Sequence, residues 1–404
     1  MPRYTRYALL GVFVNQFGAF LQAFMILYLT YRGFAEWEAS LALGGYAAGA
    51  IVGTMLGGWL TDRLGSRLTI VLAVGSAALL TLSVTMLPSL PAIVVAVFLA
   101  GAMTMVARPA ITSLLLASVP PARQVMVQAM YRTALSTGAA AGPLVAAWLS
   151  TIEWNLVFYF DAAAATAYCL IALFLFPRDR GTRTDEAPAE EATRPGYLVL
   201  LRDFRYLGYL AVMFANGLVH IQIFAVLPEM LNDAGYPTVA YSSAITASAA
   251  FVICFELLIT KVTQRWPLWI AVGTGWLLLV IGRGGYGLFE LGGLAIVLAA
   301  TLLAALGQVI GGPAAFAYPA RVAPPGMTGR YLGSAFGMFQ AGYTVGPILG
   351  IALWTQLGMS FWGVLTVFGV AVTGLLVWSM RPATPAEVSS SPQPQPQEAD
   401  STHD

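Results

Sequence analysis

The sequence predicts an all-α membrane protein in which twelve transmembrane helices form two related, pseudo-symmetric bundles of six. Of its 404 residues, 58% are hydrophobic and 10% are charged, and the mean hydropathy is +0.75, whereas a soluble domain carries about 25% charged residues. The halves also share prolines and glycines at an offset of 204 positions (109 to 313), which predicts a duplicated body. The first copy holds Pro109, Ala110, Pro120, Pro121, Gly138, Gly142 and Pro143, and the second holds Pro313, Ala314, Pro324, Pro325, Gly342, Gly346 and Pro347.

Twelve apolar runs are long enough to cross a bilayer, which takes about 20 residues. The first is longer than the core of a signal peptide and lacks a cleavage motif, so we expect a retained helix. The first six runs predict an N-terminal bundle over 1–176, and the last six a C-terminal bundle over 205–381. The runs lie near 7–31, 38–61, 68–88, 91–118, 123–150, 154–176, 205–231, 238–260, 266–289, 292–319, 328–357 and 360–380.

Basic residues predict the orientation. With the N-terminus inside, sixteen of the twenty Lys and Arg residues are cytoplasmic, Arg32 is in an outer loop, and Arg108, Arg132 and Arg283 lie within helices. Cytoplasmic loops are enriched in Lys and Arg, so both termini are expected in the cytoplasm, with the protein in the cell (inner or plasma) membrane. These charges serve topology, and no nucleic-acid partner is expected. The sixteen are Arg3, Arg6, Arg63, Arg67, Arg123, Arg178, Arg180, Arg183, Arg194, Arg202, Arg205, Lys261, Arg265, Arg321, Arg330 and Arg381.

Two stretches lack an apolar face. Residues 177–204 are rich in Arg, Asp, Glu, Pro and Thr, which predicts a cytoplasmic linker with a short surface helix near Tyr197–Phe204. Residues 382–404 contain mostly Pro, Ser, Gln and acidic side chains. Such a composition cannot offset ordering entropy, so a disordered cytoplasmic tail is expected.

A charged turn between the second and third runs carries the first motif, Gly58-Trp59-Leu60-Thr61-Asp62-Arg63-Leu64-Gly65-Ser66-Arg67. It resembles the signature loop of the major facilitator superfamily, G-x-L-x-D-R-x-G-R-R/K, and departs from it at Ser66, where the family usually has a basic residue. The resemblance implies that Asp62 meets the start of the eleventh run near Thr328–Arg330 in the outward-facing state, where a helix N-terminus favours an acid. The implied cytoplasmic gate comprises Gly58, Asp62, Arg63, Gly65 and Arg67. The alternative is a solvated turn that serves topology alone.

The fifth run carries a second motif, Gly138-Ala139-Ala140-Ala141-Gly142-Pro143. It is similar to the G-x-x-x-G-P pattern of the drug-exporting antiporter branch of that superfamily, with Ala146 and Ala147 where Gly-Gly is common. The resemblance covers roughly residues 5–380 and implies the twelve-helix fold. Proline lacks a backbone donor and glycine lacks a side chain, so the helices are expected to bend here, or only to pack tightly. The residues concerned are Gly138, Gly142, Pro143, Gly346 and Pro347.

Two arginines are placed deep in their spans. Arg108 precedes Pro120 by 12 residues and Arg132 follows Pro121 by 11, which puts them about 18 and 16 Å from the inner helix ends. That depth is near the midplane of a core about 30 Å thick. A charge there needs water or a partner. We expect both to line a cavity and attract a substrate carboxylate or phosphate. The alternatives are that one of them forms a structural ion pair, or that Arg108 is turned aside by Pro109.

Polar side chains recur at this depth on otherwise apolar helices. Because duplicated transporters hold their substrate between the halves near the midplane, we expect these side chains to line the same cavity as the two arginines. Each alone has the alternative of an interhelical hydrogen bond. They are Gln22, Gln128, Asn216, Gln222, Gln308 and Gln340.

Proton coupling requires a group that changes charge near the working pH. His220, deep in the seventh run, titrates in that range, although a lone histidine is also a common hydrogen-bonding residue. Asp161, in the sixth run, is the second candidate and lies about 12 Å from Glu153 by helix rise. Glu229 and Glu256 are further candidates, but they are placed near span ends, where a solvated role is easier.

These features predict a secondary transporter that moves a small organic molecule by alternating access, with proton-coupled efflux as the first expectation. The alternatives are uptake or exchange of an organic anion, which the arginines favour, and a non-transporting membrane sensor. The sequence shows no metal-ligand cluster, nucleophile triad or phosphate loop, so neither an enzyme nor a cofactor or metal is expected. The expected partners are the lipid bilayer, a small-molecule substrate that can be anionic, and protons; a monomer is expected.

Overall fold

The computed structural model describes residues 1–177 and 197–381, and this part of the chain is built from helices and short connections. Eleven helical stretches are long and apolar enough to cross a membrane. One of them, Leu268–Val322, is 55 residues long and holds two crossings, because the backbone leaves the helical conformation at Gly292 and Gly293. The described residues therefore make twelve crossings, which confirms the predicted fold. Residues 178–196 of the expected linker over 177–204, and the expected tail over 382–404, lie outside the described residues.

The crossings match the apolar runs closely. The first half contains α1 (Arg3–Phe17), α2 (Leu21–Tyr31), α3 (Glu36–Leu64), α4 (Ser66–Met86), α5 (Leu90–Ala117), η1 (Pro121–Arg123), α6 (Gln124–Ile152) and α7 (Trp154–Leu175). The second half contains η2 (Tyr197–Arg202), α8 (Phe204–Asp233), α9 (Thr238–Thr263), α10 (Leu268–Gly284), η3 (Gly285–Leu288), α11 (Phe289–Val322), α12 (Thr328–Leu357) and α13 (Ser360–Met380).

The first crossing differs from the expected single helix over 7–31. It is broken between α1 and α2, at Gly18 to Phe20. The backbone N–H groups of Phe20 and Leu21 donate to the carboxylate of Asp161 on α7, at 3.0 and 2.9 Å. The break is stable because these freed donors, which begin α2, are satisfied by a side chain.

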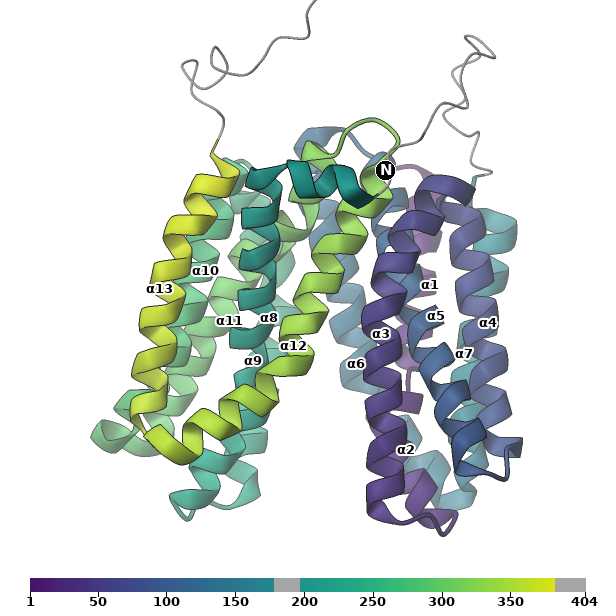
Figure 1. The fold of residues 1–404 in the computed structure, drawn as a ribbon, viewed down its shortest axis with the longest axis horizontal. Coiled ribbons are helices and arrows are strands. Elements are labelled where there is room, and N and C mark those ends of the chain that lie inside the picture. The colour runs from purple at the N-terminus through teal and green to yellow at the C-terminus, as the bar shows by residue number, and fades with distance from the viewer. Residues whose placement is uncertain (178–196, 382–404) are drawn as a thin grey trace, which may run out of the picture.

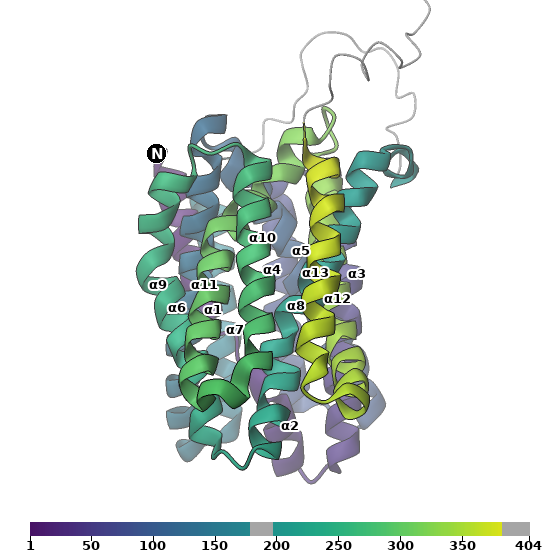
Figure 2. The ribbon, with the colours of Figure 1, turned by 90° about the vertical axis from the view of Figure 1, so that its left-hand side faces the viewer.

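The helices form two groups, α1 to α7 on the right of Figure 1 and α8 to α13 on its left. Within the first group α3 packs on α5, and α4 on α5 and α7; within the second, α8 packs on α12, and α10 on α11 and α13. Two buried apolar clusters fill the first group and one large cluster fills the second. Viewed from the side of α10 and α13, the long helices run along a common direction (Figure 2).

Several helix pairs join the groups: α3 packs with α12 and α6 packs with α9, while α11 also contacts α6 and α12 also contacts α5. α12 begins 204 positions after α6 (124 to 328), and α9 begins 202 positions after α3 (36 to 238). By the repeat, α3 corresponds to α9 and α12 corresponds to α6. The α3–α12 contact and the α6–α9 contact are therefore equivalent, as expected for two related halves.

The start of α1 and the end of α13 lie at the same end of the molecule, at the top of Figure 1. We call it the terminal end. Successive crossings alternate in direction, so the described basic residues outside the helix interiors gather at this end, while Arg32 lies at the opposite end. Toward the opposite end the two groups of helices diverge (Figure 1).

Candidate functional site

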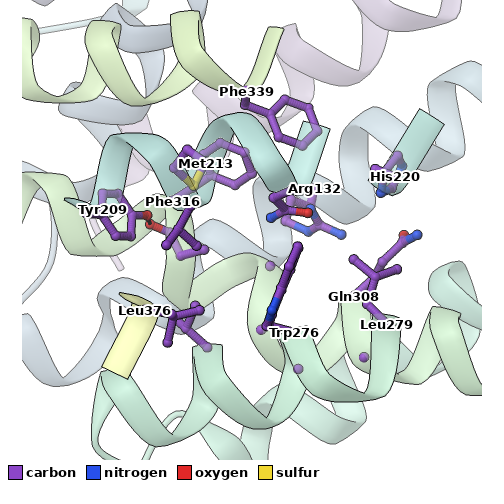
Figure 3. A pocket seen from close by; sticks show the side chains of 18 residues that line it. Arg132, Tyr209, Met213, His220, Trp276, Leu279, Gln308, Phe316, Phe339 and Leu376 are labelled. Carbon is purple, nitrogen blue, oxygen red and sulfur yellow. Dashed lines mark hydrogen bonds between the residues drawn. The ribbon is translucent and has the colours of Figure 1, made fainter. Parts of the chain in front are cut away.

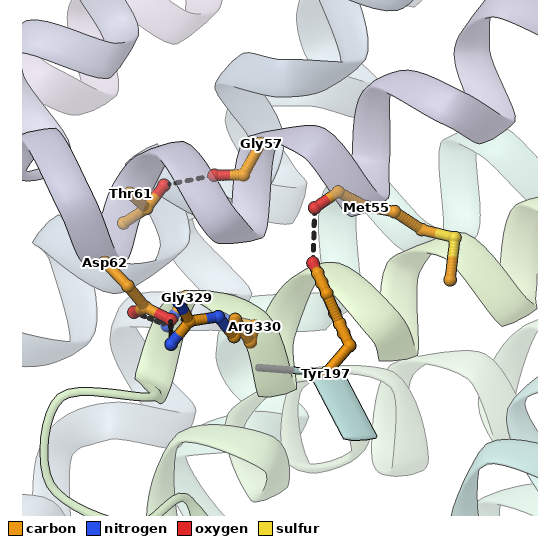
Figure 4. Close-up of polar contacts among 7 residues, drawn as sticks. All are labelled: Met55, Gly57, Thr61, Asp62, Tyr197, Gly329 and Arg330. Carbon is orange, nitrogen blue, oxygen red and sulfur yellow. Dashed lines mark hydrogen bonds and ion pairs between the residues drawn. The ribbon is translucent and has the colours of Figure 1, made fainter. Parts of the chain in front are cut away.

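At the terminal end the Asp62 carboxylate of α3 contacts the first turn of α12 (Figure 4). The backbone N–H of Gly329 donates to Oδ1 at 2.6 Å and that of Arg330 donates to Oδ2 at 3.0 Å, while Nη1 of Arg330 lies 3.7 Å from Oδ2. A helix N-terminus exposes unpaired N–H groups and partial positive charge, so an anion binds well there. The contact implied by the motif is present, and it joins the two halves.

Glycines bring the two helices together beside this carboxylate. A Cβ atom on Gly333 of α12 would lie 2.7 Å from the carbonyl oxygen of Thr54 and 2.9 Å from the Cα of Gly58. Gly58 in turn lies against the backbone of Gly329. α3 and α12 thus touch backbone to backbone, which only residues without side chains permit.

The rest of the motif shapes the α3–α4 turn. Gly65 joins the two helices in one residue with φ +84° and ψ 163°, a conformation that is essentially limited to glycine. The Arg63 guanidinium stacks over the Trp59 ring at 5.1 Å. Arg67 donates to the carbonyls of Ala172 and Leu173 on α7. The contacts described for these two arginines lie within the first half.

The short helix η2, expected from the sequence near this position, lies beside the same contact. The Tyr197 hydroxyl donates to the Met55 carbonyl of α3 (Figure 4). Burial raises the pKa of Tyr197 to about 12, and the nearby Asp62 charge acts in the same direction. The hydroxyl therefore stays protonated at neutral pH and remains a donor.

A cavity of about 710 Å³ lies between the two halves. Its walls come from α5 and α6 on one side and from α8 to α12 on the other. It extends from Arg132 toward the opposite end, past Ser136 and Ala140 of α6 and Ile245 of α9. Rings line much of it, contributed by Tyr131, Phe224, Phe316, Phe336, Phe339 and Tyr343.

The Arg132 side chain reaches from α6 in the first half to α9 in the second half. Its Nε lies 2.5 Å from Oε1 of Glu256 on α9, forming a charged hydrogen bond between the halves. The Arg132 side chain is 22% exposed and lines the cavity, whereas the Glu256 side chain is fully buried. Its guanidinium also lies against Gly312 of α11, and the close-up shows it beside Trp276 and Phe316 (Figure 3).

Two further arginines line the same cavity. Arg108 comes from α5, as expected, and also borders an adjoining cavity of about 140 Å³. Arg283 of α10 is almost fully buried and donates from Nη1 to the Tyr286 hydroxyl at 2.7 Å. Within the described residues no carboxylate forms an ion pair with either side chain. The sequence placed Arg283 inside a helix without assigning it to the cavity.

The structure brings most of the predicted polar side chains to these cavities. Gln128 and Gln308 line the main one, Gln22 and Gln340 line the adjoining one, and Asn216 lines a slot of about 60 Å³ beside Arg132. Both polar atoms of the Gln128 side chain are buried, and neither has a hydrogen-bond partner among the described residues.

The expectation for Gln222 is corrected. Its side chain is fully buried between α8 and α12, where its amide donates to the Leu218 carbonyl at 2.8 Å and to the Gly346 carbonyl at 3.0 Å. An amide at the right depth on α8 therefore faces the neighbouring helix, where it forms the interhelical hydrogen bond that was the alternative.

The Gly-Pro segments lie at matching contacts within each half. Gly138 and Gly142 of α6 sit against the α1 backbone near Phe17, and Gly346 of α12 sits against α8 near Leu218. Pro143 and Pro347 are inside helices that continue without a break. Close packing is thus directly visible, and bending during transport stays a prediction.

The two proton-coupling candidates occupy different surroundings. His220 lines the main cavity, with its ring 6.0 Å from that of Phe339 and 6.1 Å from that of Tyr343. Asp161 is buried and caps α2 through the two backbone bonds described above. The geometry gives Asp161 a structural task within the first half.

Replacing Asp161 by leucine is expected to lower stability without changing the pH dependence of transport. Two backbone N–H groups would lose their acceptor, and each unsatisfied buried donor costs about 1–3 kcal/mol. Thermal unfolding in detergent and the pH profile of transport measure the two effects. A changed pH profile at full expression would instead give Asp161 a part in coupling.

Glu256 is a residue to which the sequence reasoning gave too little weight, because it was placed near a span end. In the structure α9 continues to Thr263, so Glu256 lies seven residues inside it, about 10 Å by helix rise. Arg132 lies eight residues inside α6, about 12 Å. The depth argument used for the arginines, applied to α9, could have found the pair.

Two groups of six crossings around a central polar cavity define a membrane transporter. The chain belongs to the Major Facilitator Superfamily, whose family model matches residues 8–335 and so reaches into both halves. This match confirms the resemblance carried by the motifs. Because members of this family are carriers, it also supports the prediction that the chain is not an enzyme.

The chain is similar to the uncharacterized MFS-type transporter YttB of Bacillus subtilis (strain 168), with 22% identity over 372 residues, covering 89% of this chain and 90% of YttB. It is also similar to the multidrug resistance protein MdtH of Edwardsiella ictaluri (strain 93-146), with 27% identity over 261 residues and 62% of each chain covered. Among solved structures, the proton:xylose symporter XylE aligns with a TM-score of 0.75 at 14% identity, covering 94% of this chain and 95% of that one. The human organic anion transporter MFSD10 aligns with a TM-score of 0.69 at 15% identity, covering 93% and 100%. At these identities the solved structures show a shared fold alone.

Proposed function

We propose that this transporter moves a small organic anion across the bilayer by alternating access. The observation that carries the proposal is the set of three arginines, Arg108, Arg132 and Arg283, in one cavity between the halves. The lining residues described for this cavity include no Asp or Glu, and the one carboxylate beside it, Glu256, is held by Arg132. Such an excess of positive charge in a low-dielectric site attracts anions.

The remaining walls indicate what the rest of the substrate is like. Six aromatic rings surround the arginines, and aromatic walls favour an apolar or aromatic body. The unpartnered amide of Gln128 offers one donor and one acceptor at the same place. We therefore propose an amphipathic anion with a ring system attached to its charged group.

Proton-driven efflux is the second candidate, supported by the similarity to proteins named multidrug resistance protein MdtH. The gathering of basic residues at the terminal end supports a cytoplasmic position for that end and for both termini. In that orientation the present conformation faces outward, and the Asp62 contact acts as the cytoplasmic gate.

Substrate charge is tested with three probes that share one ring system. The full chain in detergent is titrated with naphthalene-2-sulfonate, with neutral naphthalene-2-sulfonamide and with cationic 2-naphthylmethylamine, and binding is read from thermal shift. We expect the sulfonate to bind best. Arg108→Ala is expected to weaken sulfonate binding about 10- to 100-fold, as for loss of a charged hydrogen bond.

Arg265→Ala is the matched control, because Arg265 is exposed at the terminal end. It is expected to leave binding unchanged. Preference for the amine or the sulfonamide contradicts the anion proposal, and the amine outcome would favour export of cationic drugs. Counterflow of the preferred probe in proteoliposomes then tests transport itself.

A further inference from the structure

The ion pair between Arg132 and Glu256 links the two halves at the edge of the substrate cavity. Its cation is reachable from the cavity, whereas its carboxylate is fully buried behind the cation. Oε1 of Glu256 accepts from Arg132, and Oε2 has no hydrogen-bond partner among the described residues. An anion that enters the cavity therefore meets a guanidinium whose present partner is a carboxylate of the protein.

Resting on the anion function proposed above, we propose that the substrate takes the place of Glu256 on Arg132, and that Glu256 then accepts a proton. One proton consequently crosses the membrane together with each substrate molecule, in the same direction. Glu256 is the proton-carrying group, and Arg132 is the group that substrate and Glu256 share in turn.

Among the residues that the structure describes, Arg132 is the one cation that forms an ion pair with Glu256. α9 packs against α6, α8 and α11. α6 contributes Arg132, and α8 contributes His220 to the neighbouring cavity wall. α11 has no charged side chain between Glu290 and Arg321. Arg283 of α10 lines the cavity and is hydrogen-bonded to Tyr286.

A buried carboxylate without a cation is strongly disfavoured as an ion, so it takes up a proton. The state with substrate bound and Glu256 still charged is thus rare. This energetic penalty couples the protonation of Glu256 to the binding of substrate.

The exchange changes no covalent bond of the substrate. The Nε–H of Arg132 moves its hydrogen bond from Oε1 of Glu256 to a substrate oxygen, and a proton from the aqueous cavity forms an O–H on the Glu256 carboxyl. On the other side of the membrane the proton and the anion leave, and the ion pair forms again. Empty and loaded carriers have the same net charge, so flux of a monoanion is expected to be insensitive to membrane potential.

Proton uptake on binding measures the exchange directly. The full chain in detergent and weak buffer, with a pH indicator, is titrated with naphthalene-2-sulfonate, which is ionised at every pH used. Wild type is expected to take up about one proton for each anion bound, as linkage requires. Glu256→Gln is expected to bind the anion with proton uptake reduced at least about tenfold. Glu290→Gln, which alters an exposed carboxyl at the opposite end, is the control and is expected to match wild type.

Gly312→Ala provides a second variant that keeps the carboxyl. A Cβ there would lie 2.7 Å from Cζ of Arg132, the mobile end of a flexible side chain, so the arginine shifts while the helices keep their packing. With the pair loosened, Glu256 is already protonated before substrate arrives. Proton uptake per bound anion is expected to fall below the wild-type value.

Three outcomes separate the inference from the proposed function. If wild type binds no organic anion, the proposed function fails, and the inference fails with it. If anions bind but protons are released, or if Glu256→Gln takes up protons like wild type, the inference alone is overturned. In proteoliposomes an acidic exterior is expected to drive the sulfonate inward in wild type and to leave Glu256→Gln without accumulation.

Discussion

Replacing Asp62 by asparagine is expected to reduce transport at least tenfold while the protein still inserts into the membrane. The carboxylate accepts two backbone N–H groups of α12 and lies near the Arg330 guanidinium. The neutral amide has one acceptor oxygen, so one charge-assisted hydrogen bond and the ion pair are lost. Charged hydrogen bonds contribute about 1.5–3 kcal/mol each, which corresponds to a shift of about 10- to 150-fold away from the conformation closed at the terminal end.

Two measurements check this result. Counterflow in proteoliposomes gives the transport rate, and distances between spin labels on α3 and α12 at the terminal end give the conformational equilibrium. Glu36→Gln, which neutralises an exposed carboxyl at the start of α3, is the control. Normal transport by Asp62→Asn would remove the gate assignment and leave the turn with a topological role.

Replacing Arg132 by alanine is expected to destabilise the folded protein by about 3–5 kcal/mol, because the fully buried Glu256 loses its cation and must either stay an unpaired ion or be protonated. Removing both charges with Arg132→Ala and Glu256→Gln together is expected to recover most of this loss. The reason is the asymmetry of buried pairs, in which one orphaned charge costs far more than the absence of both. Substrate binding is not recovered, because the guanidinium is absent in both variants.

A double-mutant cycle, in which the free energy of unfolding is measured in detergent, isolates the interaction energy between Arg132 and Glu256. Arg265→Ala, an exposed arginine at the terminal end, is expected to stay within about 0.5 kcal/mol of wild type. If Arg132→Ala and the double variant lose the same amount of stability, Arg132 stabilises the protein through packing rather than through its ion pair with Glu256.

Hydropathy and a few motifs were sufficient for the fold, because the bilayer requires long apolar helices whose ends are set by proline, glycine and charge. They could not show that the first crossing is broken, since the break depends on a carboxylate, Asp161, that is distant in sequence.

For the candidate site, the sequence indicated how deep each side chain lies along its helix, but not which way the side chain points around the helix. Counting residues placed Arg108 and Arg132 deep in their helices, and both line the cavity, as does Gln128, which was expected near the same depth. Gln222 was expected near that depth too, yet its side chain faces α12. Depth along a helix can be read from sequence, whereas the direction around the helix depends on which neighbours pack against it. Glu256 was named as a proton-coupling candidate but was discounted, because its helix is longer than its apolar run indicated.

The glycine contact between α3 and α12 bears on how easily the molecule changes conformation. Where Gly58, Gly329 and Gly333 meet, much of the contact is between backbone atoms, so few side chains have to rearrange when the helices separate. The activation barrier for parting there is then governed by a handful of polar bonds at Asp62, and such bonds form and break quickly once water enters. A carrier built in this way can cycle rapidly even though each half stays rigid.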